Sequence, residues 1–223
     1  MKDNPKKYSW TYRNSLTVVF LSLFLLTLIG QAIAGWREFN HELVEKGAAE
    51  IGFRAYLTTG HFLSATFENF QSEFLQMSMY VVFTIFLRQI GSAESKSMEG
   101  TGEVDREPVP HPDAPWPVKK GGWILKLYQN SLSLVFLLLF LVSWWFHLYG
   151  SWEDHNLQQS LENKPTESLT SYLSEPTFWF ETFQNWQSEF LSVAAIVILT
   201  VFLRQKGSPE SKPVDAPYME TGK

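Results

Sequence analysis

The chain lacks cysteine, and two long stretches of it lack charge. With no Cys among 223 residues, disulfides, thiol catalysis, thiolate metal sites and iron–sulfur clusters are excluded. No Asp, Glu, Lys or Arg occurs in 14–36 or 127–152, runs of 23 and 26 residues rich in Leu and Phe. Each run exceeds the roughly 20 residues that a helix needs to cross a bilayer. The sequence therefore predicts an integral membrane protein. The net charge of −5 argues against a nucleic-acid-binding one.

The chain also contains an internal duplication. At an offset of 116 positions, residues 12–96 align with residues 128–212 without a gap, with 34 identities in 85 pairs. Three blocks are kept best: Asn-Ser-Leu, Phe-x-Asn-x-Gln-Ser-Glu-Phe and Phe-Leu-Arg-Gln. The loop within each copy has diverged but kept its length. A repeat of this kind indicates two copies of one supersecondary unit.

Each copy is predicted to contribute two transmembrane helices, which gives an all-α polytopic fold with four. The second span of each copy has a charge-free core of only 14 residues, which rises about 21 Å and is too short to cross. We therefore extend it towards the N-terminus past Glu73 or Glu189, which places both carboxylates at or inside the outer membrane boundary. The expected spans are, in chain order, about 14–35, 67–88, 130–151 and 183–204.

The distribution of Lys and Arg predicts the orientation of the chain in the membrane. The two tails and the central segment carry 14 of these residues, and the two loops carry 4. The positive-inside rule then places both termini in the cytoplasm, with the two hairpins in the same orientation.

The expected parts are repeat 1 (1–96), a flexible cytoplasmic linker with five prolines (97–118), repeat 2 (119–212) and a disordered C-terminal tail (213–223).

A polar motif, Asn-x-Gln-Ser-Glu, is present in both copies. In a helix its Asn and Glu share a face, and a carboxylate at membrane depth needs a protein partner. Counted from the cytoplasmic side, His147 lies at the height of Glu189, and its counterpart Gln31 lies at the height of Glu73. We therefore expect hydrogen bonds His147–Glu189 and Gln31–Glu73. The candidate ligand- or proton-binding residues are Glu73, Glu189, His147, Gln31, Asn69, Asn185, Gln71, Gln187, Ser72 and Ser188.

A structural interpretation of this motif is the alternative. Polar residues at the start of a helix cap its free N–H groups, and a Glu there suits the helix dipole. Interhelical hydrogen bonds in membranes also set helix register, at about 0.6 kcal/mol each on average.

No cofactor or metal site is predicted. The segment His41-Glu42-Leu-Val-Glu45 is similar to a zinc-protease helix but lacks the second His. Only His147 lies at membrane depth, and a transmembrane haem held between two imidazoles needs a second His.

The repeated unit, with its Asn-Ser-Leu span, Gln71-Ser72-Glu73-Phe74 and Gln187-Ser188-Glu189-Phe190, resembles an uncharacterised bacterial membrane-protein family defined as a domain of unknown function. The resemblance implies a location in the bacterial cytoplasmic membrane and brings no activity. We expect a non-enzymatic four-helix module that acts through self-association or within a larger membrane assembly. The alternative is a small transporter, channel or sensor in which Glu73 and Glu189 bind a proton or cation.

Overall fold

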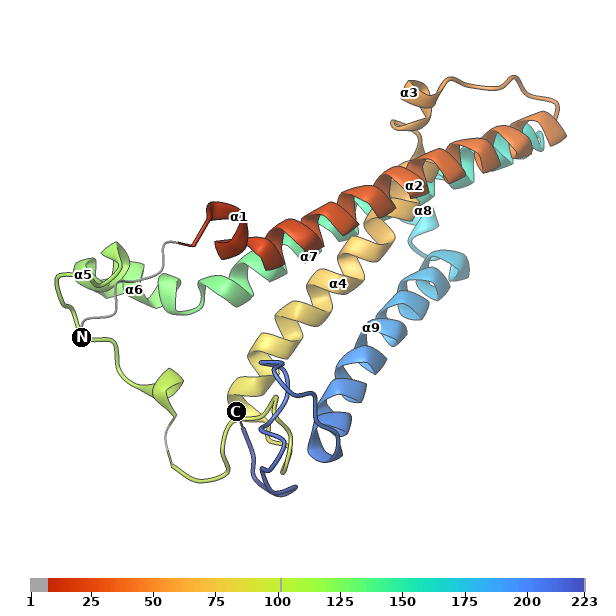
Figure 1. The fold of residues 1–223 in the computed structure, drawn as a ribbon. Coiled ribbons are helices and arrows are strands. Elements are labelled where there is room, and N and C mark those ends of the chain that lie inside the picture. Colours follow the sequence, from red (N-terminus) through yellow and green to blue (C-terminus); the bar gives the residue numbers. More distant parts are fainter. Residues whose placement is uncertain (1–7, 101, 223) are drawn as a thin grey trace. The chain divides into compact units, whose positions relative to one another are not determined.

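The computed structural model describes residues 8–100 and 102–222, and within them every regular element is helical (Figure 1). The long helices are α2 (Ser15–Glu45), α4 (Gly60–Phe86), α7 (Ser131–Leu161) and α9 (Pro176–Phe202). The short ones are α1 (Trp10–Arg13), α3 (Phe53–Tyr56), a 3-10 turn η1 (Glu103–Asp105), α5 (Trp116–Lys120), α6 (Gly122–Gln129) and α8 (Leu169–Tyr172). The 3-10 turn η1 and the first three residues of α5 lie in the segment 97–118 that was predicted as a linker.

Helix bounds recur at the offset of the sequence duplication. The bounds of α7, α8 and α9 are those of α2, α3 and α4 moved by 116 positions. The helices extend beyond the expected spans: α2 and α7 continue ten residues beyond 35 and 151, and α4 and α9 begin seven residues before 67 and 183. Hydropathy marks the apolar part of a helix, whereas its main-chain hydrogen bonds continue through polar residues. The loops within the copies shorten to 46–59 and 162–175.

Three of the long helices, not four, are long and apolar enough to cross a membrane. They are α2, α7 and α9, whose most apolar windows have mean hydropathies of 2.3, 2.0 and 1.4. Helix α4, which contains the expected span 67–88, is not among them, because it carries Gln71, Ser72, Glu73, Gln76 and Ser78 in its middle.

The chain forms two compact units, which cut across the two copies. The first unit comprises Met1–Leu63 and Gly150–Glu167, and the second comprises Ser64–Tyr149 and Ser168–Lys223. The first unit contains α2, the loop 46–59 and the C-terminal end of α7. The second contains most of α4 and α7, all of α9, and the segments that follow α4 and α9.

A hydrogen-bonded clamp closes the loop 46–59 in the first unit. The indole Nε1 of Trp36 donates to the carbonyl of Ile51 at 2.8 Å. The Asn40 amide donates to the same carbonyl at 3.0 Å and accepts from the Ile51 N–H at 2.8 Å. Both side chains of α2 thus hold one peptide group of the loop.

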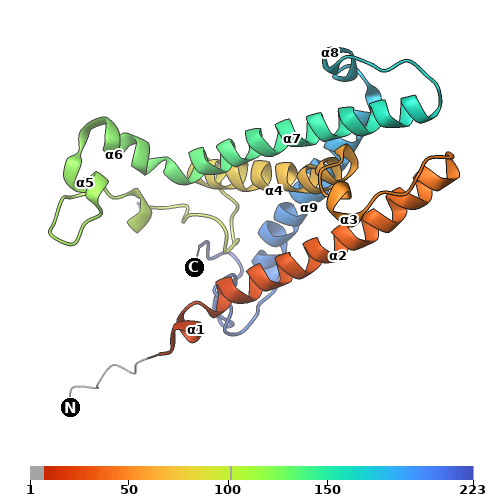
Figure 2. The ribbon, with the colours of Figure 1, turned by 90° about the horizontal axis from the view of Figure 1, so that it is seen from above.

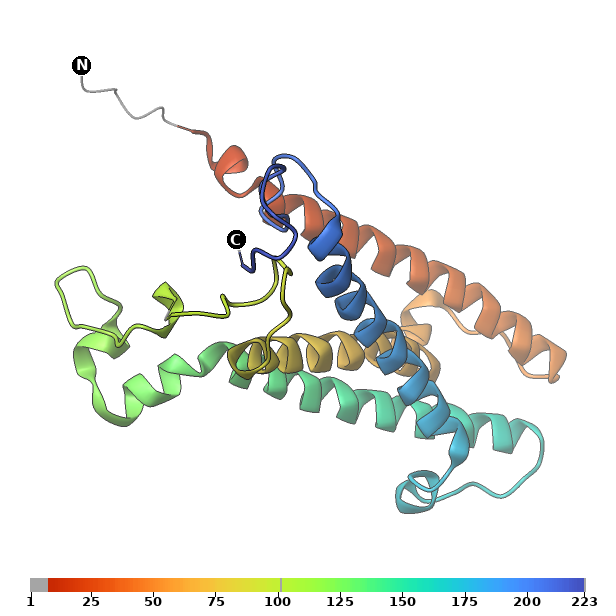
Figure 3. The ribbon, with the colours of Figure 1, turned by 90° about the horizontal axis from the view of Figure 1, so that it is seen from below.

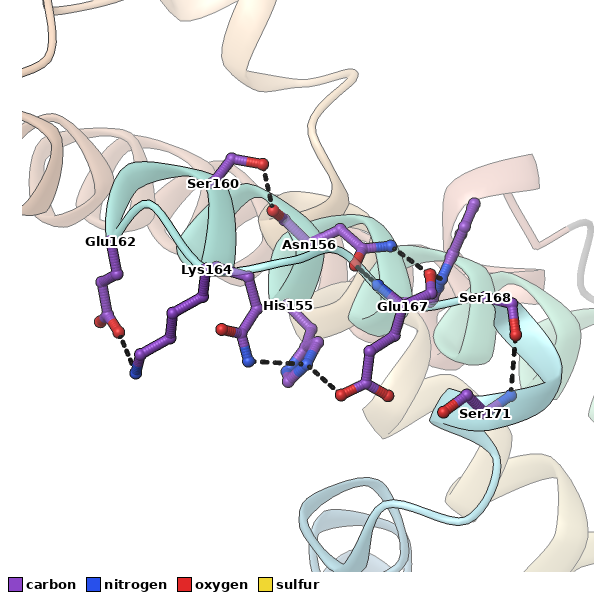
Figure 4. Close-up of polar contacts among 10 residues, drawn as sticks. His155, Asn156, Ser160, Glu162, Lys164, Glu167, Ser168 and Ser171 are labelled. Carbon is purple, nitrogen blue, oxygen red and sulfur yellow. Dashed lines mark hydrogen bonds and ion pairs between the residues drawn. The ribbon is translucent and has the colours of Figure 1, made fainter.

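The same clamp occurs after α7. Trp152 Nε1 donates to the carbonyl of Glu167 at 2.8 Å, and the Asn156 amide donates to it at 3.0 Å and accepts from the Glu167 N–H at 2.7 Å (Figure 4). Glu167 also faces His155 across 3.7 Å. Trp152 and Asn156 lie 116 positions after Trp36 and Asn40. These residues are identical in the two copies because they make the same contacts.

Replacing the clamp asparagines tests this assignment. We expect Asn156→Ala to speed hydrogen exchange of the Glu167 amide about tenfold, and Asn40→Ala to do the same at Ile51, because each change removes a hydrogen bond that contributes about 0.5–1.5 kcal/mol. Hydrogen–deuterium exchange of the full chain in detergent measures both. Ser160→Ala is the control, since its hydroxyl bonds only the Asn156 carbonyl within α7 at 2.8 Å. Unchanged protection in both Asn variants would contradict the clamp.

An aromatic core lies beneath the first loop. Phe39, Leu43 and Tyr56 are buried there, and the Tyr56 hydroxyl lies 3.1 Å from His61 Nδ1. Burial, with the nearby carboxylates of Glu38 and Asp154, raises the pKa of Tyr56 to about 12. The phenol therefore stays neutral and hydrogen-bonded throughout the physiological range.

In the second unit, α4 packs antiparallel to the first part of α7 (Figure 2). The rings of Phe67 and Phe146 stack at 4.8 Å, those of Phe74 and Phe136 lie 6.4 Å apart, and Ser78 donates to the Ser133 carbonyl at 3.4 Å. The buried side chains of these helices are largely polar, whereas large apolar side chains face outward. This distribution suits a protein whose solvent is lipid.

The C-terminal segment folds back on the chain that follows α4 (Figure 3). The Gly222 N–H donates to the Ser92 carbonyl at 3.0 Å, and the Gly91 N–H donates to Thr221 Oγ1 at 2.9 Å. The buried Lys212 ammonium donates to the carbonyls of Pro217, Tyr218 and Glu220. The structure thus places the described tail residues in hydrogen-bonded contact, where the composition predicted a disordered segment.

Candidate functional site

Three ligand-type side chains meet where α4, α7 and α9 pack together in the second unit. Glu68 comes from α4, His147 from α7 and Glu181 from α9. One ligand atom from each lies within 4.8 Å of the other two. His147 Nε2 is 4.0 Å from Glu181 Oε2, which is too long for a hydrogen bond. We call these residues the Glu–His–Glu cluster.

His147 is fully buried, and neither of its ring nitrogens has a hydrogen-bond partner in the part of the chain that the structure describes. Its ring packs against Phe178, with centroids 5.0 Å apart, and Phe178 in turn meets Trp144 edge-on. Buried polar groups normally have partners. The apolar rings fix the position of the imidazole but offer its nitrogens no hydrogen bond.

The neighbours of the cluster are polar as well. The Asn185 amide donates to Glu68 Oε1 and, at 3.0 Å, to the Glu181 carbonyl. Trp186 Nε1 donates to Gln71 Oε1 at 3.3 Å. Two further buried polar atoms, Gln71 Nε2 and Thr182 Oγ1, lack a hydrogen-bond partner among the described residues. The region is therefore a polar interior that its own side chains do not fully satisfy.

The expected hydrogen bond between His147 and Glu189 is wrong. The carboxylate facing His147 is that of Glu181, two helical turns before Glu189. The estimate took the helix axes as parallel to one another and counted residues along each helix from its cytoplasmic end. The actual register is set by ring contacts such as Trp144 on Phe178, and α9 begins early enough to present Glu181.

Glu189 instead interacts directly with the side chain of its counterpart, Glu73. Glu189 is half-buried and Glu73 is exposed within the chain. The two copies of the motif therefore bring their carboxyl groups together. Gln31 is half-buried in α2 and belongs to the first unit.

The motif lies inside its helices and does not cap them. Because α4 starts at Gly60 and α9 at Pro176, the N-cap interpretation is wrong. The hydroxyls of Ser72 and Ser188 donate to the carbonyls of Asn69 and Asn185, both at 2.8 Å, as serines inside helices often do. Of the remaining motif residues, Gln71 is buried and Gln187 is exposed.

Sequence reasoning missed Glu68 and Glu181. Each is a carboxylate in one copy only, since their counterparts at the offset of 116 are Gln184 and Ala65. A search restricted to duplicated residues passes over both. A list of charged residues on α4 and α9 that differ between the copies would have found them.

A protein-family model matches the chain. No curated protein and no solved structure matches the chain. The model of the domain of unknown function DUF6766 matches residues 7–223, which is almost the entire chain. The chain therefore belongs to the DUF6766 family.

Proposed function

We propose that this chain is a non-enzymatic membrane module that acts by associating with itself or as an accessory component of a larger assembly in the bacterial cytoplasmic membrane. Each copy crosses the bilayer twice, α4 included, with both termini in the cytoplasm. Membrane lipid and other membrane helices are its partners, and nucleic acid is not.

The surface of α2 carries this proposal. Only 6% of its most apolar window is buried within the chain, and residues such as Leu16, Phe20 and Leu26 are more than 60% exposed. A helix of this kind needs lipid or another helix around it. Lipid alone can surround this apolar surface. The polar side chains inside the second unit, however, favour a bundle to which helices of another chain are added.

The oligomeric state of the full chain in lipid nanodiscs tests the association. We expect a defined species with more than one chain, or stable co-purification with a membrane partner, by mass photometry after extraction from native membranes. A monomer with no partner at every concentration would overturn the proposal.

The contact between Glu73 and Glu189 favours a second candidate function, transport or sensing of a proton or cation. The double variant Glu73→Gln with Glu189→Gln separates the two. Lost proton flux in liposomes with unchanged assembly supports transport, whereas loss of assembly supports the structural role. Glu99→Gln with Glu107→Gln, two exposed linker residues, is the matched control for the change in charge.

A further inference from the structure

The Glu–His–Glu cluster has the composition of a metal site. Imidazole nitrogen and carboxylate oxygen are shared ligands of Mn²⁺, Fe²⁺ and Zn²⁺, and the set contains no sulfur. The three ligands come from three helices that pack within one unit. Such placement on rigid elements is what a metal site requires.

The spacing of the ligand atoms is close to that of a coordination shell. Bonds of about 2.0–2.2 Å in a tetrahedral arrangement put neighbouring ligand atoms about 3.3–3.6 Å apart. His147 Nε2 and Glu181 Oε2 are separated by 4.0 Å. A side-chain movement of about half an ångström brings these two atoms into range of one ion. The ligand atom of Glu68 lies within 4.8 Å of both and has to move closer as the ion binds.

Burial of His147 is the independent observation that points to a ligand. Its side chain is 0% exposed, and both nitrogens lack a hydrogen-bond partner among the described residues. A metal bond would satisfy Nε2. The Glu181 side chain is 37% exposed, so an ion can reach the imidazole past this carboxylate. Asn185, which donates to Glu68, orients one ligand as outer-shell residues do.

We infer that Glu68, His147 and Glu181 bind one divalent first-row transition-metal ion, with further coordination positions open to water or an external ligand. The site goes beyond the proposed association role. His147 is 16 residues, about 24 Å, beyond Ser131 and so lies near the middle of α7, whereas Glu68 and Glu181 lie close to the N-terminal ends of α4 and α9. The counterparts Gln184, Gln31 and Ala65 cannot reproduce the set. The duplicated chain therefore has one site, not two.

Zinc binding to the full chain in detergent tests the site. After removal of metal with a chelator, competition against a chromophoric chelator should give one tight Zn²⁺ per chain, and Co²⁺ should show visible bands typical of nitrogen and oxygen ligands. We expect Glu181→Gln and Glu68→Gln each to weaken Zn²⁺ binding at least about 100-fold, since loss of an outer-shell partner alone costs 10–100-fold. His41→Gln with Glu45→Gln removes an exposed His–Glu pair and should leave the affinity unchanged.

A thermal measurement keeps the test valid if a variant folds poorly. Zn²⁺ should raise the Tm of the unmodified chain by several degrees and leave the Tm of Glu181→Gln unchanged. Two equal sites, no zinc bound by the unmodified chain, or loss of binding only in the His41 variant would each overturn the inference. None of these results depends on the oligomeric state, so the site and the association role can fail separately.

Discussion

A membrane-impermeant maleimide applied to intact cells is expected to label Glu50→Cys and Thr166→Cys and to leave Val109→Cys and Val214→Cys unlabelled until the cells are lysed. The chain has no cysteine of its own, so each variant carries one thiol. All four positions are exposed, which removes burial as a reason for protection. The first two lie in the loops 46–59 and 162–175, and the others lie in the linker and the tail.

This labelling pattern decides whether α4 crosses the bilayer. If only α2, α7 and α9 cross while the N-terminus remains inside, the linker and the C-terminus are outside and the loop 162–175 is inside. Val109→Cys and Val214→Cys are then labelled in intact cells and Thr166→Cys is protected. The two topologies thus predict opposite results at three of the four positions. External labelling of Val109→Cys would refute the four-span arrangement with cytoplasmic termini.

Hydropathy and duplication predicted much of the fold. The charge-free runs located α2 and α7, and the offset of 116 related the bounds of α2, α3 and α4 to those of α7, α8 and α9. The clamp residues can also be recognised in the sequence. Trp36, Asn40 and Tyr56 are identical in the two copies although most residues around them differ, and the structure shows that they hold the loop 46–59 or pack beneath it.

The Glu–His–Glu cluster was harder to predict because none of its three residues is repeated in the other copy. His147 was a candidate from its place in the charge-free run, but its partner was assigned by height along ideal helices. Which carboxylate faces it depends on how α9 is set against α7, and packing of Phe178 between Trp144 and His147 determines that register. Side-chain packing of this kind is not encoded in a one-dimensional polar pattern.

Substituting Ala for Gly91 is expected to destabilise the second unit more than the same change at Gly207. The two glycines are counterparts in the duplication and have nearly equal positive φ angles, 82° and 85°. Each substitution therefore places a Cβ in a left-handed conformation, which costs about 1–2 kcal/mol. Their surroundings differ. A Cβ at Gly91 would lie 2.3 Å from the Tyr218 carbonyl oxygen, whereas nothing lies within 4 Å at Gly207.

The difference in stability between the two variants measures the effect of the tail packing closely on Gly91. The clash at Gly91 adds about 1–3 kcal/mol of overpacking unless the tail moves away. We expect Gly91→Ala to lower the Tm more than Gly207→Ala and to speed exchange of the Gly222 amide, which bonds the Ser92 carbonyl. Thermal unfolding and hydrogen exchange of both variants measure these effects. Equal losses of Tm, with the Gly222 amide equally protected in both, would show that the tail does not pack on the segment after α4.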